Sequence, residues 1–374
     1  MSKPALPQGG RPGAFLRALR PALLLGSVCG VVPVSGSDGT WRPLSTAALR
    51  SALISALLLA LGAAAFVSYP KAFFTFGSAL QVFAALRFLI LPLKWFGMVV
   101  WVWSNARRLE AYFKACSQYE NNFDPLELRD ATRYVRNYVG LMVALTTFYT
   151  FHMEEVFSSF PVWFQVALII NMCGMANGTA VWLMIMDGSC LSLADAFRGV
   201  SRRLRVALSR NNIPQLRRLV RQHGQLCQLA GVFCRTFGGL LTICIYTMAL
   251  DLSLDIYLRA RSGQREVGVG SAVFVWLERL ASLLPLLLLK LTTNAGDRVV
   301  RRAQRAAELV RGHTLASSRT DDDPDYAVLL AKLDGQQVHM NMNGYFILDR
   351  SLFIQTMKDI MTLIIAVAQF DMTA

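Results

Sequence analysis

Seven apolar segments run through this chain, and each is long enough to cross a lipid bilayer as a helix. A transmembrane helix needs about 20 residues to span roughly 30 Å of hydrocarbon. Of the 374 residues, 54% are hydrophobic and only 17% are charged, a composition too apolar for an ordinary soluble protein. We therefore predict an all-α membrane protein with seven transmembrane helices. The segments lie at roughly 47–68, 77–104, 139–158, 162–187, 231–256, 271–292 and 350–370.

The basic residues predict how these helices are oriented. The net charge is +14, and Lys and Arg cluster before the first segment and after the second, fourth and sixth. The alternate connections carry fewer positive charges. Lys71 stands alone after the first segment, no Lys or Arg lies between His152 and Pro161, and Arg259, Arg261 and Arg265 follow the fifth segment. Because positively charged loops stay in the cytoplasm, we expect a cytoplasmic N-terminus and an extracellular C-terminus. A seven-span G-protein-coupled receptor has the opposite orientation.

The same pattern divides the chain into four parts. Residues 1–46 form a cytoplasmic N-terminal segment with a short amphipathic or re-entrant element, although its apolar run also imitates a secretory signal. Residues 47–293 hold the first six transmembrane helices, with cytoplasmic helical extensions over 188–230. Residues 294–349 form a cytoplasmic loop and an anchor helix, and residues 350–374 form the seventh transmembrane helix.

Two stretches carry residues that interrupt helices. The sequence Asn-Asn-Ile-Pro at 211–214 predicts a break within the cytoplasmic extensions. Residues 311–325 are rich in Ser, Thr, Asp, Gly and Pro and predict a flexible loop. Helical spacing of apolar residues resumes after this loop.

Motifs of catalysis or metal binding are missing from the sequence. The seven cysteines and four histidines are scattered without metal-ligand spacing, and this arrangement predicts free thiols. No nucleophile elbow, phosphate-binding glycine loop or paired-carboxylate motif occurs, so we predict no enzyme activity, no cofactor and no metal site. The basic stretches lack interleaved aromatic residues, which predicts contact with anionic membrane lipids rather than nucleic acid.

The last apolar segment carries its polar residues on one side. At 100° per residue, the members of this polar stripe fall within about one third of the helix circumference. One polar side on an otherwise apolar helix is typical of a helix that lines a water-filled pore in an assembly of subunits. Alternatively, Thr362 and Gln369 form hydrogen bonds between helices, as polar residues do in membrane bundles. The stripe comprises Gln355, Lys358, Asp359, Thr362, Ala366, Gln369 and Phe370.

Three short stretches resemble one protein family. Residues 362–370, Thr-Leu-Ile-Ile-Ala-Val-Ala-Gln-Phe, are similar to the C-terminal signature of insect gustatory receptors, which is Thr-Tyr, five apolar residues and Gln-Phe. Leu363 stands in place of the Tyr. Residues 344–353 resemble the lead-in to the last helix of that family, and residues 24–34 resemble its glycine-containing N-terminal segment. These stretches cover about a tenth of the chain and stand in the family's order.

The resemblance implies a ligand-gated, nonselective cation channel in the plasma membrane of chemosensory neurons. Such a channel is a homotetramer, or a mixed tetramer with related subunits, that a small-molecule tastant opens to monovalent and divalent cations. Residues 325–343 are implied to form the cytoplasmic half of the last helix, which anchors four subunits at the centre. Gln369 and Phe370 are implied to form the gate, with Thr362 and Ala366 on the same pore-lining stripe.

Charged and turn-forming residues surround this stripe. Asp371 is expected to add a ring of carboxylates that favours cations, and it is equally well explained as an interfacial charge. Lys358 lies deeper and opposes cations unless it pairs with Asp359 or ions leave laterally. Residues 343–344, Asn-Gly, suit the break before the membrane half, and Asp349 suits the cap at its start.

The resemblance also implies a ligand pocket in the outer half of the bundle formed by the second to sixth helices. Its candidate residues are ionisable, aromatic or hydrogen-bonding side chains within that region. An alternative for Arg87 and Glu278 is a structural pair near the middle of the membrane. The candidates are Arg87, Thr146, Tyr149, Thr150, Trp163, Gln165, Tyr246, Asp251, Trp276 and Glu278.

Other functions share this pattern. Ile364 stands where sugar-receptor relatives carry Glu, which favours bitter or fructose-type ligands. An insect odorant-receptor-type channel subunit has the same architecture. A non-channel seven-span receptor or a solute carrier is the alternative from another class.

Overall fold

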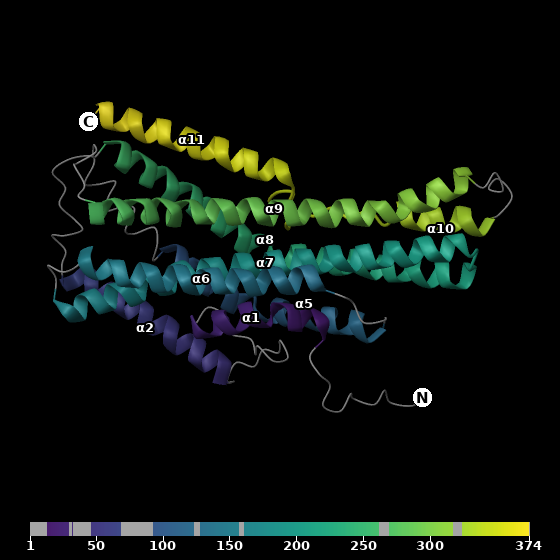
Figure 1. The fold of residues 1–374 in the computed structure, drawn as a ribbon, viewed down its shortest axis with the longest axis horizontal. Coiled ribbons are helices and arrows are strands. Elements are labelled where there is room, and N and C mark those ends of the chain that lie inside the picture. Colours follow the sequence, from purple (N-terminus) through teal and green to yellow (C-terminus); the bar gives the residue numbers. More distant parts are fainter. Residues whose placement is uncertain are drawn as a thin grey trace.

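The computed structural model describes residues 13–29, 32, 46–68, 93–122, 128–156, 161–261, 269–316 and 324–373, and its helices lie side by side (Figure 1). Residues 93–104 are helical as well. Over these ranges, regular structure other than helix is confined to a β-bridge between Asn341 and Ile347, so the predicted all-α fold is confirmed. The labelled helices are α1 (Ala14–Val28), α2 (Thr46–Ser68), α5 (Ala106–Asn122), α6 (Arg129–Val156), α7 (Val162–Ser209), α8 (Ile213–Arg261), α9 (Val269–Ala316), α10 (Pro324–Asp334) and α11 (Arg350–Thr373).

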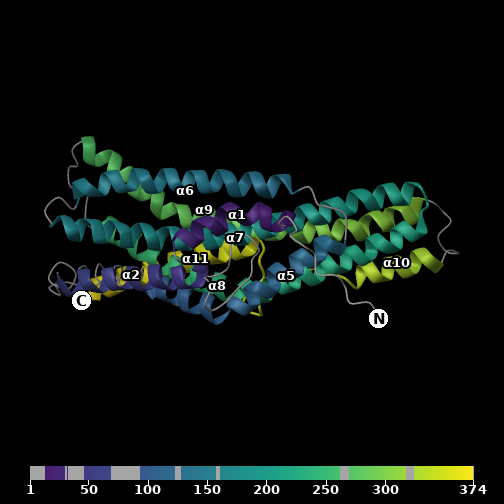
Figure 2. The same cartoon turned by 90° about the horizontal axis from the view of Figure 1, so that it is seen from below.

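Three helices are far longer than a membrane is thick. α7, α8 and α9 contain 48, 49 and 48 residues, which corresponds to about 72 Å at 1.5 Å per residue. The hydrocarbon layer takes up less than half of that length. Each of these helices is therefore long enough to continue well beyond a bilayer, and α10 lies beside their ends at one end of the molecule (Figures 1 and 2). Residues 188–230 belong to α7 and α8, apart from the break at residues 210–212.

Several predicted segments coincide with helices. α2 matches the predicted segment 47–68 to within one residue. In the described part of the chain, three stretches are long and apolar enough to cross a membrane: Gly178–Ser209, Ile213–Leu258 and Arg350–Gln369. The predicted segment 77–104 is described only from residue 93 onward. The number of spans and their orientation stay predictions.

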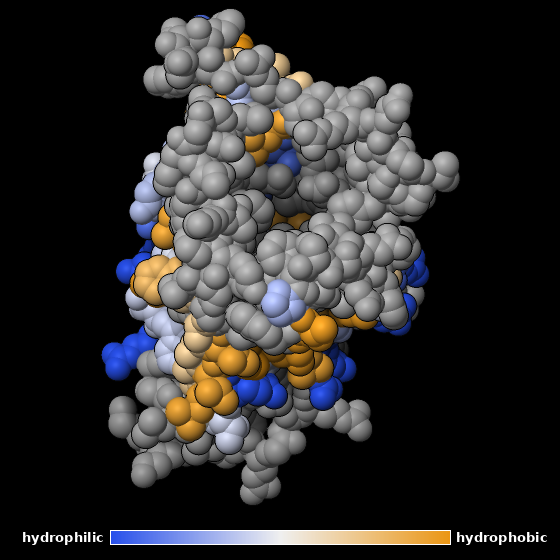
Figure 3. All heavy atoms as spheres, turned by 90° about the vertical axis from the view of Figure 1, so that its left-hand side faces the viewer, coloured by the Kyte–Doolittle hydropathy of each residue, from blue (hydrophilic) through white to orange (hydrophobic). Residues whose placement is uncertain are grey.

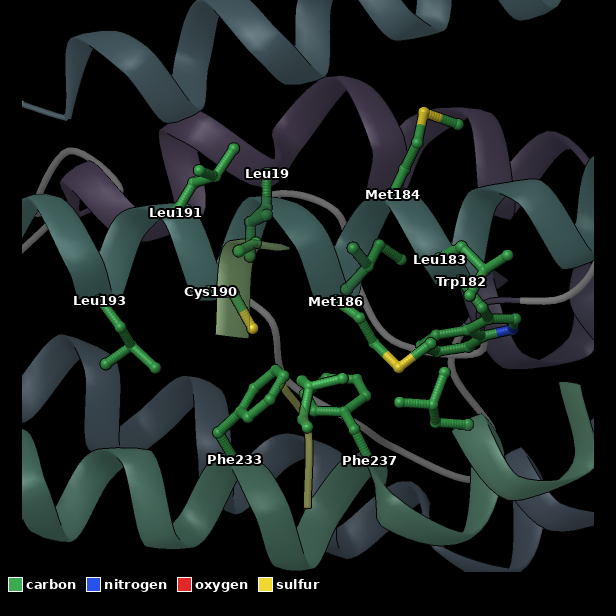
Figure 4. Packing of buried hydrophobic residues seen from close by; sticks show 14 of the residues in the cluster. Leu19, Trp182, Leu183, Met184, Met186, Cys190, Leu191, Leu193, Phe233 and Phe237 are labelled. Atoms are coloured by element: carbon green, nitrogen blue, oxygen red, sulfur yellow. The ribbon is translucent and has the colours of Figure 1, made fainter. Parts of the chain in front are cut away.

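The core is built around the middle of α7. Trp182, Met186 and Cys190 of α7 point toward Phe233 and Phe237 of α8 (Figure 4). The apolar stretch of α7 is 94% buried inside this one chain. A helix that is apolar all round is stable only where its whole circumference is covered, and here neighbouring helices supply that cover.

α1 is part of this core. Phe15 and Leu19 are buried, and the helix packs against α5, α6 and α7. Its first turn is closed by α5, because the Phe15 backbone N–H donates to Glu120 Oε1 at 2.6 Å. Burial raises the pKa of Glu120. The short element expected before the first span is therefore a packed helix.

A second apolar cluster holds together the ends of α7, α8, α9 and α10. α7 ends where Asn211 adopts a left-handed conformation, with φ 50°. The Asn212 N–H then donates to the Ala207 carbonyl at 3.1 Å, and Asn212 Oδ1 accepts from the Gln215 N–H to cap α8. The break predicted at 211–214 is confirmed. The cluster comprises Leu204, Ala207, Leu208, Leu216, Leu219, Val220, Ala306, Val310, Tyr326, Leu329 and Leu333.

The predicted helix over 325–343 is wrong in its second half. α10 ends at Asp334, and residues 336–342 run as extended chain instead. The reason is their period of two: Val338, Met340 and Met342 are buried, while the residues between them are exposed. Asn343 and Gly344, with φ 56° and 83°, then form the tight Asn-Gly turn of a small hairpin. The Tyr345 N–H donates to the Met342 carbonyl at 3.1 Å, and the Met342 N–H donates to the Phe346 carbonyl at 2.8 Å.

Glycines let this hairpin lie directly on two helices. A Cβ atom on Gly238 of α8 would lie 2.9 Å from the Met342 carbonyl group, and one on Gly296 of α9 would lie 2.5 Å from the Leu348 carbonyl oxygen. Real Cβ atoms do not approach other atoms so closely. The hairpin is therefore wedged between α8 and α9, and it fixes the point at which α11 starts.

We predict opposite effects for two glycine substitutions in α8. Gly238→Ala forces the hairpin backbone to shift, at a cost of about 1–3 kcal/mol in folding free energy. Gly231→Ala meets nothing within 4 Å and gains up to about 1 kcal/mol of helix propensity. Thermal unfolding of the purified protein in detergent, followed by size-exclusion chromatography, should show a lower Tm for the first variant only. Equal Tm values for both variants would contradict the wedged hairpin.

Candidate functional site

α11 is held firmly at its start. Asp349 caps the helix, because its Oδ1 accepts from the Ser351 N–H at 2.8 Å and from the Leu352 N–H at 3.3 Å. Arg350 forms an ion pair with Asp297 of α9 at 3.0 Å. The cap predicted at Asp349 is confirmed.

One face of α11 packs against α8 and α9. Thr356 and Ile360 are 2% and 1% exposed, and the Ser253 hydroxyl of α8 donates to the Ile360 carbonyl at 3.2 Å. The Lys290 ammonium of α9 lies 5.9 Å above the ring of Phe353. These contacts define the protein-facing side of the helix.

The opposite face of α11 carries the polar stripe. Phe353 and Thr362 are nine residues apart, or about two and a half turns, so they point in opposite directions. Thr362 and Gln369 are exposed, as are Gln355 and Lys358, and Ala366 is half-buried. The Thr362 hydroxyl donates to the Lys358 carbonyl of its own helix at 3.0 Å, a bond that does not link it to another helix of this chain.

The apolar remainder of α11 is almost bare. Only 11% of its apolar stretch is buried in this chain, in contrast to 94% for α7. Ile354, Met361 and Ile365 form a ridge along one edge of the stripe and are 57%, 54% and 55% exposed. Such a surface is stable only against lipid or another protein. Figure 3 views the molecule from the end at which α11 finishes, and the apolar side chains that it shows gather low on that face, at the level where Figure 1 shows α2.

The predicted gate lies partly outside the described side chains. Phe370 and Asp371 belong to the last turns of α11, and their side chains are not among those described. Thr362, Ala366 and Gln369 share one face, as the periodicity predicted. The role of these five residues stays a prediction.

The predicted ligand residues are dispersed over several helices. Tyr246 is 71% exposed on the surface of α8, and Asp251, five residues later, is half-buried on a different face. Arg87 lies outside the described residues. Thr146, Tyr149 and Thr150 lie on α6, Trp163 and Gln165 on α7, and Trp276 and Glu278 on α9, all with side chains outside the described part. The ligand region therefore stays a prediction.

Sequence reasoning missed several buried ionisable side chains, among them Asp187 and Lys94. Asp187 of α7 is 1% exposed and accepts a 2.5 Å hydrogen bond from the Tyr134 hydroxyl of α6. Lys94 is 6% exposed and lies beside Cys244 of α8. Each lies within an apolar stretch of the sequence. An ionisable residue in such a stretch is costly unless it has a partner, so this position could have indicated both residues.

Comparison with known proteins identifies a family and two solved structures that are similar to this chain. The family model described as 7tm Chemosensory receptor matches residues 19–374. Two structures of the insect olfactory receptor OR5 from Machilis hrabei, one of them in complex with eugenol, are similar to this chain. Each has a TM-score of 0.62 and 11% sequence identity, and the match covers 94% of this chain and 97% of that receptor. No curated protein sequence matches.

Two threonines on different faces of α11, about 120° apart around the helix, provide a matched test of the exposed face. With a charged, membrane-impermeant thiol reagent, Thr362→Cys should react at least about tenfold faster than Thr356→Cys, because the second side chain is reached only through local opening of the packed face. The measurement is the rate of labelling in native-like membranes, after subtraction of the labelling of the parent chain. Equal rates, or a Thr362→Cys that stays unlabelled, would show that water does not reach the stripe.

Proposed function

Because this chain belongs to the 7tm chemosensory receptor family, we propose that it is a gustatory receptor that acts as a tetrameric, ligand-gated, nonselective cation channel. The observation that carries the proposal is the polar stripe on the uncovered face of α11. A membrane helix that exposes Gln, Lys and Thr to lipid is costly. The cost disappears when copies of α11 surround a water-filled path and turn their stripes toward it.

The proposed gate is the end of α11. Phe370 rings that converge near the axis make a narrow apolar constriction, which dewets and blocks ions. Rotation or splaying of the helices withdraws the rings and lets the Gln369 amides line the path. Asp371, at the mouth, favours cations there.

The proposed orientation places the long ends of α7, α8 and α9 in the cytoplasm together with α10. The basic residues concentrated at these ends support this side, since positive charge stays inside. The apolar cluster between these ends and α10 makes them one rigid unit. Such a unit is suited to the central anchor of a tetramer in the plasma membrane.

The proposed stimulus is a small molecule that binds in the outer half of the bundle. The OR5 complex contains eugenol, which supports a small-molecule ligand for this fold. Binding shifts the population toward the open channel only if the ligand binds the open arrangement more tightly. The residues that we propose for this pocket are the ten predicted from the sequence, from Arg87 to Glu278.

An odorant-receptor-type channel subunit is the second candidate. The fold shared with OR5 favours it, whereas the Gln-Phe pair at the end of α11 favours the gustatory type. A panel of sugars, alkaloids, amino acids and volatile phenols applied to oocytes that express the chain alone, under voltage clamp, separates the two.

Two substitutions test the gate. Phe370→Ala should raise the basal current at least about threefold, because the apolar constriction widens, and Gln369→Ala should alter the ligand-evoked current. Ile354→Ala, which removes an exposed apolar side chain near the other end of α11, serves as control and should leave the basal current unchanged. Currents are normalised to surface expression. Unchanged currents in both gate variants would count against this gate.

The position of the termini separates the receptor classes. Epitope tags at both ends, stained on intact and permeabilised cells, should show the C-terminal tag outside and the N-terminal tag inside. An extracellular N-terminus would exclude the channel orientation, and saturable uptake without ligand-evoked current would indicate a carrier.

A further inference from the structure

The polar stripe of α11 contains a lysine, Lys358, and the proposed gate does not explain the role of this residue. It is exposed, and it lies one turn before Thr362 on the same face. Its depth is about 12 Å from the start of the helix, well inside the apolar stretch. A lysine at this position is retained in a membrane helix only where water or a counter-charge compensates it.

No carboxylate compensates Lys358 within the described part of this chain. Asp359 is adjacent in sequence but turned by about 100°, so the two side chains do not face one another. The Asp359 carboxylate instead accepts a 3.0 Å hydrogen bond from the Gln355 amide. The other lysine near α11, Lys290, covers the ring of Phe353 on the packed face.

This arrangement puts a positive and a negative charge at one level of the stripe, side by side and unbridged. Repulsion by the Lys358 ammonium is twice as large for a divalent cation as for a monovalent one. At roughly 6 Å in water, one lysine disfavours the divalent cation by about threefold relative to the monovalent cation, and dissolved salt weakens this effect. Asp359 acts in the opposite sense.

We propose that Lys358 and Asp359 together set the divalent-to-monovalent selectivity of the conduction path, with Lys358 limiting the entry of Ca²⁺. This role rests on the proposed channel function. It assigns a selectivity filter to the inner half of α11, separate from the gate at Phe370. It also explains how a stripe with a lysine conducts cations, because the neighbouring carboxylate keeps the net charge of this level near zero.

The test measures reversal potentials with external Na⁺ or Ca²⁺ in oocytes that express the full chain with Phe370→Ala to supply a basal current. Lys358→Gln should raise the Ca²⁺-to-Na⁺ permeability ratio roughly threefold or more, and Asp359→Asn should lower it. The double variant should return close to the parent ratio, because both charges are gone. Lys290→Gln removes the same charge from the packed side and should leave the ratio unchanged.

The possible failures are distinguishable. A normal current whose permeability ratio is the same with and without Lys358→Gln would overturn the selectivity role and leave the channel proposal intact. Weaker subunit assembly, with an unchanged ratio in the channels that still form, would overturn the selectivity role and assign Lys358 to an ion pair between copies. Absence of any current, together with a Thr362→Cys sealed from aqueous reagents, would overturn both. If Lys358→Gln does not reach the cell surface, Lys358→Cys replaces it and is modified after assembly by a positively or a negatively charged thiol reagent. A permeability ratio that is the same after both modifications would overturn the selectivity role.

Discussion

The contact of the Met342 and Leu348 backbone with Gly238 and Gly296 determines where α11 can go. Because α8 and α9 have no side chain at these two positions, the hairpin lies flat between them and ends at the capping residue Asp349. The ion pair between Arg350 and Asp297 ties the first turn of α11 to α9. From that fixed start, α11 runs along α8 with only one face covered.

The apolar stretch of α11 is left largely uncovered by the rest of this chain. The core of the chain is closed around α7, and the ends of the long helices beside α10 have their own apolar cluster, so neither region needs a partner. The polar stripe needs water, while the ridge of Ile354, Met361 and Ile365 needs lipid or protein. In the proposed assembly, a ring of copies satisfies both requirements at once, and α11 forms the wall of the pore.

Local sequence patterns predicted much of this fold and little of the buried contacts between residues far apart in sequence. The limits of α2, the break at 211–214 and the cap at Asp349 follow from hydrophobic length, Asn and Pro chemistry and capping, which act over a few residues. The segment 336–342 was misread because Val338 fits both a helical spacing and a period of two, and only the grooves at the α8 and α9 glycines decide between them. The pairing of Asp187 with Tyr134 joins residues that are far apart in sequence, so no local pattern contains it.

The most direct test of the account is an electron cryomicroscopy structure of the purified protein in lipid nanodiscs. The account predicts several copies of α11 around one axis, with Thr362, Ala366 and Gln369 facing a continuous aqueous path and the apolar ridge against protein or lipid. A structure in which these three side chains of every copy face lipid, or are covered by their own chain, would contradict it.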